Sequence, residues 1–437
     1  MFSAGFSRLD ITPPLGTPIA GFFYERLAVG IIDPLELNAI AFNDGENTAV
    51  IVIVDALGVR EDYATKIRNL ISEELSIPAD NVMIAATHSH TSFRLGVVPS
   101  AIKSTSRSSL DSDEYIFILI RKFVDAARLA IDDLKEATVE VGEAQTKEQV
   151  SFIRRYLMKD GSVKSFPKLL DPNIVRPMGE ADNTLRLVRF NRKDGDDIVL
   201  TNFSTHPCVV SGSLFSADWP GYVRKYVEQD VPGVRCLMLV GAEGDTNHVK
   251  VFTDMVQRGP AYAAGIGRKL ADAAIEALGN TKPVNADKVS SEVRYVYNKT
   301  RTDGMEKYDE AKALYYGYYN GTIDKSTVHE QDLAGARRIL NTKIMPEYQA
   351  VPVTVMGIGD VAFVGFGGEP FTEYANRARR SAPDKYVISA ACANGFQGYL
   401  PTKAAFEDGG YESVGSFYTS SLEDEICGAA EEMLKSI

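Results

Sequence analysis

The stretch Val82-Met83-Ile84-Ala85-Ala86-Thr87-His88-Ser89-His90 is an apolar run that ends in two histidines. The run predicts a buried strand. Because side chains alternate along a strand, His88 and His90 would project on the same side where the strand ends. Neutral imidazole is a common protein ligand for transition metals, above all zinc. An H-x-H pair alone is a weak signal, since histidines also lie in protein cores with satisfied hydrogen bonds.

A second apolar run, Ile198-Val199-Leu200-Thr201-Asn202-Phe203-Ser204-Thr205-His206, also ends in a histidine. The chain holds only five histidines, and three of them follow strand-like runs. This repetition strengthens the case for a metal site. Such a site needs a carboxylate or a tyrosinate to complete its ligands.

Composition narrows the classes of partner. The chain has 437 residues and a formal net charge of -12, and it contains no long basic run, so nucleic acid and anionic membrane surfaces are excluded as partners. No apolar run approaches the roughly 20 residues that span a bilayer, and we expect no stable membrane association. The four cysteines lie far apart and the N-terminus lacks a signal-peptide pattern, which predicts a cytoplasmic protein. The chain is compatible with a homo-oligomer.

Strand-like and helix-like runs alternate along most of the chain, which predicts an α/β fold with a large mixed β-sheet core flanked by helices. Strands are expected at 36–43, 48–54, 137–143, 185–191, 197–204, 235–241, 289–297, 352–358, 361–366 and 386–392. Helices are expected near 62–75, 114–135, 258–278, 305–316, 330–340, 372–380 and 421–436. Turn pairs at Asn43-Asp44 and Gly359-Asp360 predict some antiparallel neighbours.

We expect one domain over residues 1–437, since no repeat or Pro/Gly/Ser-rich linker divides the chain. Two segments depart from the alternation. Residues 144–182 look irregular and carry aromatic and basic side chains, which predicts a substrate-covering loop. Residues 301–345 are charged and helical, which predicts a helical excursion or lid.

Polar residues follow several of the apolar runs, and ligands gather beyond the carboxyl ends of strands in open α/β sheets. Besides the histidines, these residues are Asp245, Glu369, Asn394 and Tyr399. Each of them alone is compatible with a turn or a helix cap, Asp245 in particular. Together they supply imidazoles, carboxylates and a phenol at one end of a sheet.

The order of these motifs resembles the neutral/alkaline ceramidases and their bacterial relatives. The segment 5–14, Gly-Phe-Ser-Arg-Leu-Asp-Ile-Thr-Pro-Pro, is similar to the N-terminal motif of that family. Thr87-His88-Ser89-His90 resembles its T-H-x-H motif, and Ser204-Thr205-His206-Pro207 resembles its second histidine motif. Further similar segments are Gly244-Asp245, 367–371 and 394–402, so the resemblance covers nearly the whole chain and implies a ceramidase catalytic-domain-like fold.

The resemblance implies a set of site residues. The implied ligands of a Zn²⁺ ion are His88, His206, Glu369 and Tyr399. The implied catalytic residues are His90, Arg155, Asp245 and Tyr399. The residues expected to bind substrate are Asn247, Trp219 and Phe396, where Trp219 either walls the pocket or fills the core.

Two departures from the family bear on the substrate. Asn247 stands where ceramide-cleaving members have a serine, and we expect this chain to lack their immunoglobulin-like C-terminal domain. These differences predict a smaller, more polar substrate inside the cell in place of membrane ceramide. His248 has no counterpart in the family pattern, and a solvent-facing loop position is expected for it.

The expected activity is zinc-dependent hydrolysis, in which metal-bound hydroxide attacks the carbonyl carbon of an amide. Two alternatives stay open. One is hydrolysis of an ester, lactone or glycosidic bond on the same scaffold, because a fold does not determine its chemistry. The other is a zinc-binding module without turnover. The residues do not distinguish zinc from manganese or iron.

Overall fold

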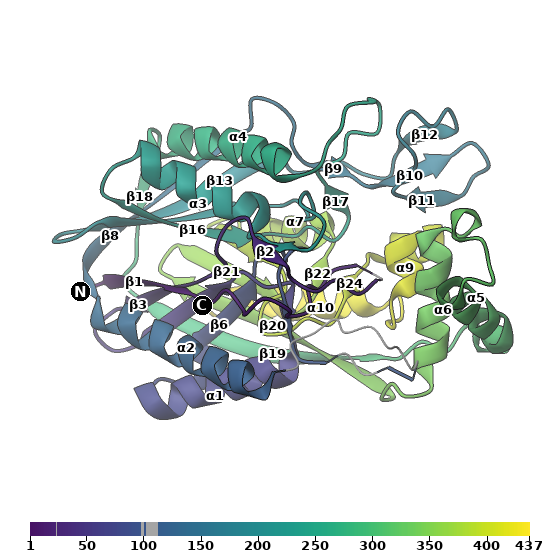
Figure 1. The fold of residues 1–437 in the computed structure, drawn as a ribbon. Helices are drawn as coiled ribbons and strands as arrows, with labels where there is room; N and C mark the ends of the chain where they lie inside the picture. The colour runs from purple at the N-terminus through teal and green to yellow at the C-terminus, as the bar shows by residue number, and fades with distance from the viewer. Residues whose placement is uncertain (23, 98–99, 102–111) are drawn as a thin grey trace.

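The computed structural model describes residues 1–22, 24–97, 100–101 and 112–437, and the described residues build a nine-stranded central sheet (Figure 1). In spatial order the strands are β16 (Val234–Val240), β14 (Asp197–Phe203), β13 (Thr184–Arg192), β8 (Lys135–Gln145), β1 (Ser3–Asp10), β3 (Glu36–Asn43), β4 (Thr48–Val54) and β6 (Val82–Ala86), and β18 (Lys282–Val284) pairs with β8. Neighbours are antiparallel except for the parallel pairs β14 with β16 and β4 with β6. The predicted mixed sheet is therefore confirmed.

A second sheet packs face to face on the first. Its strands are β19 (Val289–Lys299), β20 (Tyr348–Ile358), β21 (Val361–Phe366) and β23 (Tyr386–Ala390). One hydrophobic cluster holds residues from both sheets, including Phe42 and Phe190 of the first and Phe363 of the second. The sequence analysis did not divide the strands between two sheets.

Helices cover the outer faces of both sheets (Figure 1). The pair α1 (Glu61–Leu75) and α2 (Asp113–Asp132) packs on one half of the large sheet, and α3 (Asp218–Asp230) with α4 (Pro260–Leu278) packs on the other. The outer face of the small sheet is covered by α7 (Thr372–Ser381) and α10 (Leu422–Leu434). The layers therefore follow the order helix, sheet, sheet, helix.

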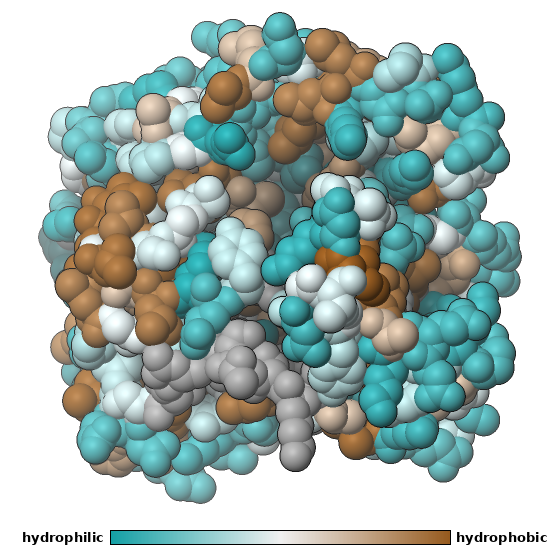
Figure 2. All heavy atoms as spheres, turned by 45° about the vertical axis from the view of Figure 1, so that its right-hand side comes forward, coloured by the Kyte–Doolittle hydropathy of each residue, from teal (hydrophilic) through white to brown (hydrophobic). Residues whose placement is uncertain are grey.

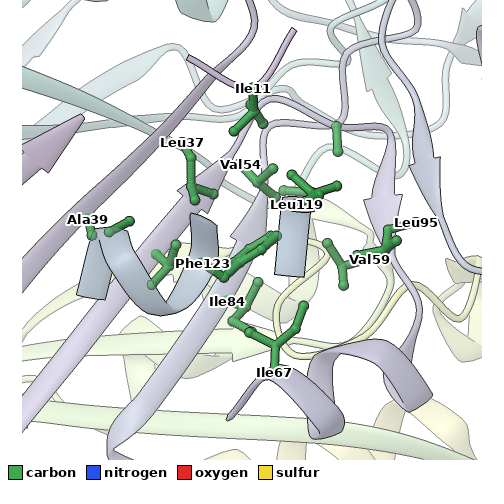
Figure 3. Packing of buried hydrophobic residues seen from close by; sticks show 14 of the residues in the cluster. Ile11, Leu37, Ala39, Val54, Val59, Ile67, Ile84, Leu95, Leu119 and Phe123 are labelled. Atoms are coloured by element: carbon green, nitrogen blue, oxygen red, sulfur yellow. The ribbon is translucent and has the colours of Figure 1, made fainter. Parts of the chain in front are cut away.

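The sequence of β4 explains why both faces of the large sheet are buried. Successive side chains of a strand point to opposite faces. The residues that face α1 and α2 are Val50, Val52 and Val54, and those that face the second sheet are Ala49, Ile51 and Ile53. Figure 3 shows Val54 and Ile84 of the parallel pair β4 and β6 packed with Ile67 of α1 and Phe123 of α2.

The two excursions have secondary structure of their own. Residues 144–182, expected to be irregular, contain β9 (Phe152–Ile153) and a three-stranded sheet of β11 (Val163–Ser165), β10 (Arg155–Met158) and β12 (Ile174–Pro177). Turns at Asp160-Gly161 and Asp171-Pro172 connect strands too short to show an apolar period. Residues 301–345 contain α5 (Tyr308–Asn320) and α6 (Glu330–Thr342), with the 3-10 helices η2 (Met305–Lys307) and η3 (Lys325–Thr327).

Shorter elements complete the chain. They are the 3-10 helix η1 (Ala79–Asn81), the helices α8 (Lys403–Asp408) and α9 (Tyr411–Gly415), and the two-residue strands β2 (Gly30–Ile31), β5 (Gly58–Val59), β7 (Arg94–Leu95), β15 (Leu214–Phe215), β17 (Thr246–Asn247), β22 (Glu369–Pro370) and β24 (Tyr399–Leu400). Several of these two-residue strands fix the loops beyond the ends of the long strands.

The strands at the two ends of the large sheet, β6 and β16, approach each other. The segment after β23 bridges them through backbone hydrogen bonds: Ala391 N donates to the Val240 carbonyl over 2.9 Å, and Asn394 N donates to the Ile84 carbonyl over 2.7 Å. The side-chain oxygen of Asn394 also accepts from Ile84 N over 2.9 Å. Asn394 therefore stabilises the fold by holding the segment after β23 against β6.

The face that turns forward in Figure 2 is mixed, with hydrophobic patches between hydrophilic residues. Among the described residues, no helix combines the length and the apolar character needed to cross a membrane.

Candidate metal centre

Two buried histidines meet where β6 and β14 end. The Nε2 atoms of His88 and His206 are 3.2 Å apart. The Nδ1–H of His88 donates to the Leu57 carbonyl over 2.7 Å, which leaves the lone pair of Nε2 free to bind a metal. Nδ1 of His206 lies 3.3 Å from the Glu243 carbonyl oxygen, and donation to that oxygen likewise frees its Nε2. Both imidazoles are thus positioned as ligands.

The backbone at His88 differs from the sequence prediction. β6 ends at Ala86, so strand alternation does not continue to His88. His88 instead takes a left-handed conformation with φ of 61°, which is uncommon for a non-glycine residue and is often found at functional sites. This turn, and not the two-residue period, brings the rings of His88 and His90 within 5.1 Å of each other.

Glu369 adds a carboxylate to the two histidines. Its Oε2 atom lies 3.4 Å from Nε2 of His88 and 3.7 Å from Nε2 of His206. Glu369 N donates to the Gly398 carbonyl over 2.9 Å, which fixes the position of β22. In the described part of the chain, the buried Oε2 has no hydrogen-bond partner. A buried oxygen without a donor is costly unless a cation satisfies it.

Glu243 is a fourth donor that the sequence analysis missed. It follows β16, is 0% exposed, and has no hydrogen-bond partner at either carboxylate oxygen among the described residues. Donor atoms of His88, His206, Glu243 and Glu369 all lie within 4.8 Å of one another. The sequence contains the pattern that identifies Glu243, since this residue follows an apolar run just as His206 does. The motif resemblance instead implies Asp245, two residues later.

The electrostatics of this cluster favour a cation. Burial lowers the pKa of His206 well below its usual value, and the nearby Arg154 and His88 lower it further, so the imidazole is neutral. Burial raises the pKa of Glu243 well above its usual value, and the charge of Glu369 adds to that effect. Neutral imidazoles with carboxylates are the donor set that zinc and related divalent ions prefer. The residues therefore fit a divalent metal ion.

His90 lies beside this cluster. Its ring contacts His206 at 5.0 Å between centroids and Phe22 at 5.5 Å, and the donor atoms of His88, His90 and His206 also lie within 4.8 Å of one another. Burial lowers the pKa of His90 well below its usual value, and His88 contributes to the shift. His90 therefore lies beside the cluster, and its part in proton transfer stays a prediction.

Arg154, and not the predicted Arg155, lies against the histidines. Arg154 Nη1 is 3.3 Å from Nδ1 of His206, and its guanidinium stacks over the ring of Tyr399 at 5.0 Å. Arg155 has other partners: its Nη2 donates to the Gly409 carbonyl over 2.6 Å, and its Nε lies 3.7 Å from Oε2 of Glu412. Because side chains alternate along an extended segment, moving the assignment by one residue moves it to the opposite face.

Tyr399 approaches the site through strand pairing. β22 and β24 are parallel, with Glu369 and Tyr399 as Cα partners, and the ring of Tyr399 lies 6.4 Å from that of His206. Burial raises the pKa of Tyr399 well above its usual value. Ligation of a metal by this phenol stays a prediction.

Of the other predicted site residues, one lies at the site and three lie elsewhere. The ring of Phe396 lies 5.5 Å from that of His88. Asp245 caps α7, because Oδ1 accepts from Thr372 N over 2.9 Å and from its hydroxyl over 2.8 Å. Trp219 is 0% exposed and packs on Phe203, so it fills the core and does not wall a pocket.

Asn247 and His248 are held by local hydrogen bonds. The Oδ1 atom of Asn247 accepts from Val249 N over 2.9 Å. His248 is buried and does not face solvent as expected, since its Nε2 contacts the Gln257 carbonyl at 2.8 Å. Neither contact involves the histidine and carboxylate cluster.

Comparison with known proteins places the fold. No protein-family model and no curated protein matches the sequence. The crystal structure of neutral ceramidase from Pseudomonas aeruginosa is similar with a TM-score of 0.75 and 17% sequence identity, over 99% of this chain and 74% of that one. A structure described as ceramidase complexed with C2 has a TM-score of 0.72 and 16% identity over the same shares. The chain therefore has a neutral ceramidase-like fold, as the motif resemblance implied.

Proposed function

We propose that this protein is a zinc-dependent hydrolase that cleaves the amide bond of a small, polar N-acyl compound. The observation that carries the proposal is the cluster of His88 and His206 with Oε2 of Glu369, a buried oxygen that has no hydrogen-bond partner among the described residues. Its position in a neutral ceramidase-like fold supports amide hydrolysis as the reaction. The motif order supports the same reaction class.

His88, His206 and Glu369 would hold the metal, and Tyr399 is a further candidate ligand. When bound, a divalent ion would supply Lewis-acid chemistry, which lowers the pKa of water from 15.7 to about 7 in zinc enzymes. Amide hydrolysis forms a bond between the water oxygen and the carbonyl carbon and breaks the C–N bond. The products are a carboxylate and an amine.

The remaining residues manage protons and charge. His90 would take a proton from the attacking water and deliver it to the leaving nitrogen, because its ring contacts both metal-ligand histidines. Arginine does not release its proton, so Arg154 serves to stabilise negative charge on the carbonyl oxygen or on Tyr399. Phe396, beside His88, would contact the acyl part of the substrate.

A hydrolysis panel tests the proposal. Metal-free protein is prepared with a chelator, reconstituted with Zn²⁺, and assayed against short N-acyl amines, esters, lactones and glycosides. We expect N-acyl cleavage that requires metal and is lost on renewed chelation. Cleavage confined to esters or glycosides would overturn the amide assignment, and bound metal without turnover on any substrate would favour a binding module.

A further inference from the structure

Glu243 is the one member of the four-residue cluster to which the proposed function gives no role. The side chain is fully buried, and neither carboxylate oxygen has a hydrogen-bond partner in the described part of the chain. A buried carboxylate normally has a donor or a counter-ion. Its carboxylate is instead grouped with the free donor atoms of His88, His206 and Glu369, all within 4.8 Å.

The backbone around Glu243 holds the side chain in this place. Gly244 N donates to the Pro370 carbonyl over 2.8 Å, and a Cβ atom at position 244 would overlap the Glu369 carbonyl oxygen. The loops that carry the two glutamates are therefore in direct backbone contact, which glycine alone allows. The Glu243 carbonyl also lies 3.3 Å from Nδ1 of His206. Three members of the cluster thus share one rigid frame.

Charge balance points to the same conclusion. Glu243 and Glu369 would each carry one negative charge, while the nearest cation, Arg154, is already bonded to Glu412 with 2.7 Å between Nε and Oε1. Two carboxylates and two neutral imidazoles balance the charge of one divalent ion. Without such an ion, two charged carboxylates at this separation would repel each other, which favours protonation of one of them.

We propose that Glu243 is a protein ligand of the metal, which gives this site two histidines and two carboxylates. The inference rests on the metal of the proposed function but not on the reaction. Oxygen-rich ligand sets suit ions that accept five or six ligands, such as Mn²⁺ and Fe²⁺, as well as Zn²⁺.

Metal-binding measurements on matched variants test this inference. Wild type, E243Q, E369Q, Y399F and the control E140Q are dialysed against buffered Zn²⁺ and, separately, Mn²⁺, and bound metal per chain is measured by mass spectrometry. Glu140 lies away from the cluster and bonds to Thr281. We expect one ion per chain with unchanged affinity in wild type and E140Q, and a loss of at least about 10-fold in E243Q and E369Q, while Y399F shows separately whether the phenol is also a ligand.

A folded E243Q, judged by circular dichroism, that binds metal as tightly as wild type would overturn the proposal, even if its turnover is lost. Should E243Q fail to fold, crystals of wild type soaked in Mn²⁺ decide the question by anomalous scattering. A carboxylate oxygen of Glu243 about 2.2 Å from the ion supports ligation, and a Glu243 turned away from it refutes ligation. If the wild-type protein hydrolyses N-acyl compounds and E243Q still binds metal, the proposed function stands and this inference fails. If E243Q loses the metal but the wild-type protein hydrolyses no substrate, this inference stands and the proposed function fails.

Discussion

Arg154 and Glu412 form a buried ion pair, with 2.7 Å between Nε and Oε1. The second oxygen of Glu412 accepts a hydrogen bond from the Ser165 hydroxyl over 2.6 Å. The carboxylate on α9 thereby holds the guanidinium beside His206 and over the ring of Tyr399. Residues far apart in the sequence thus place one positive charge at the edge of the histidine and carboxylate cluster.

Removing this charge tests the role of Arg154. We expect R154M to keep the metal and to lower kcat by about 10²- to 10³-fold, because one preorganised donor to the transition state is lost. Steady-state kinetics together with metal analysis checks this. R155M is the matched variant, and it should change thermal stability more than turnover, since Arg155 bonds to the Gly409 carbonyl. Wild-type kcat in R154M would show that the guanidinium has no catalytic part.

Alanine at His88 or His206 should abolish both metal content and hydrolysis, because each residue supplies one ligand nitrogen. H90Q should behave differently. It is expected to retain the metal and to lose about 10²- to 10⁴-fold in kcat, as for a missing proton-transfer group. Metal stoichiometry measured beside kcat separates the two classes. Full metal content in H88A and H206A would refute the ligand assignment.

Trp219 offers a test of core against pocket. W219A should destabilise the fold by about 3–5 kcal/mol, since it leaves a large cavity beside Phe203. Urea denaturation measures this loss. W219F should fold with a smaller loss and leave KM unchanged, because no part of the indole is exposed to a substrate. A large rise in KM with unchanged stability would instead identify Trp219 as a substrate contact.

His248 should contribute to the pH dependence of stability. Burial lowers the pKa of its imidazole from the usual 6.5 to about 4. Between these values the unfolded chain binds more protons at this position than the folded chain, so the stabilising contribution is complete above about pH 6.5 and is lost as the pH falls toward 4. The slope for one group is about 1.4 kcal/mol per pH unit.

The comparison of wild type with H248Q isolates this term, since glutamine can still donate to the Gln257 carbonyl but does not titrate. Unfolding free energies of metal-free protein are measured from pH 7 to pH 4. The difference between the two proteins should grow in favour of H248Q as the pH falls. A difference independent of pH would mean that His248 has the same pKa in the folded and the unfolded chain.

Much of the candidate site was predictable because its residues follow apolar runs. His88, His206 and Glu369 each come directly after a run that forms a buried strand, and the structure brings their donor atoms together. Glu243 belongs to the same pattern. The motif resemblance implies Asp245 in its place, and in the structure Asp245 caps α7.

Predictions based on the alternation of side chains were wrong where the chain leaves regular secondary structure. Arg154 lies between the short strands β9 and β10, and Arg155 is the first residue of β10, so no apolar pattern shows which of the two side chains meets the histidines. His88 likewise departs from strand geometry through its φ of 61°. Neither feature is encoded in local hydrophobicity.

The amino-acid sequence by itself determined most of the long strands and helices and the positions of the histidines after apolar runs, because the burial of apolar side chains imposes a local and readable period. Only the tertiary structure decided that the strands form two packed sheets and that β6 and β16 approach each other. It also selected Arg154 and Glu243 as neighbours of the histidines. These choices depend on contacts between residues distant along the chain, whose free energy is gained only when the whole fold assembles.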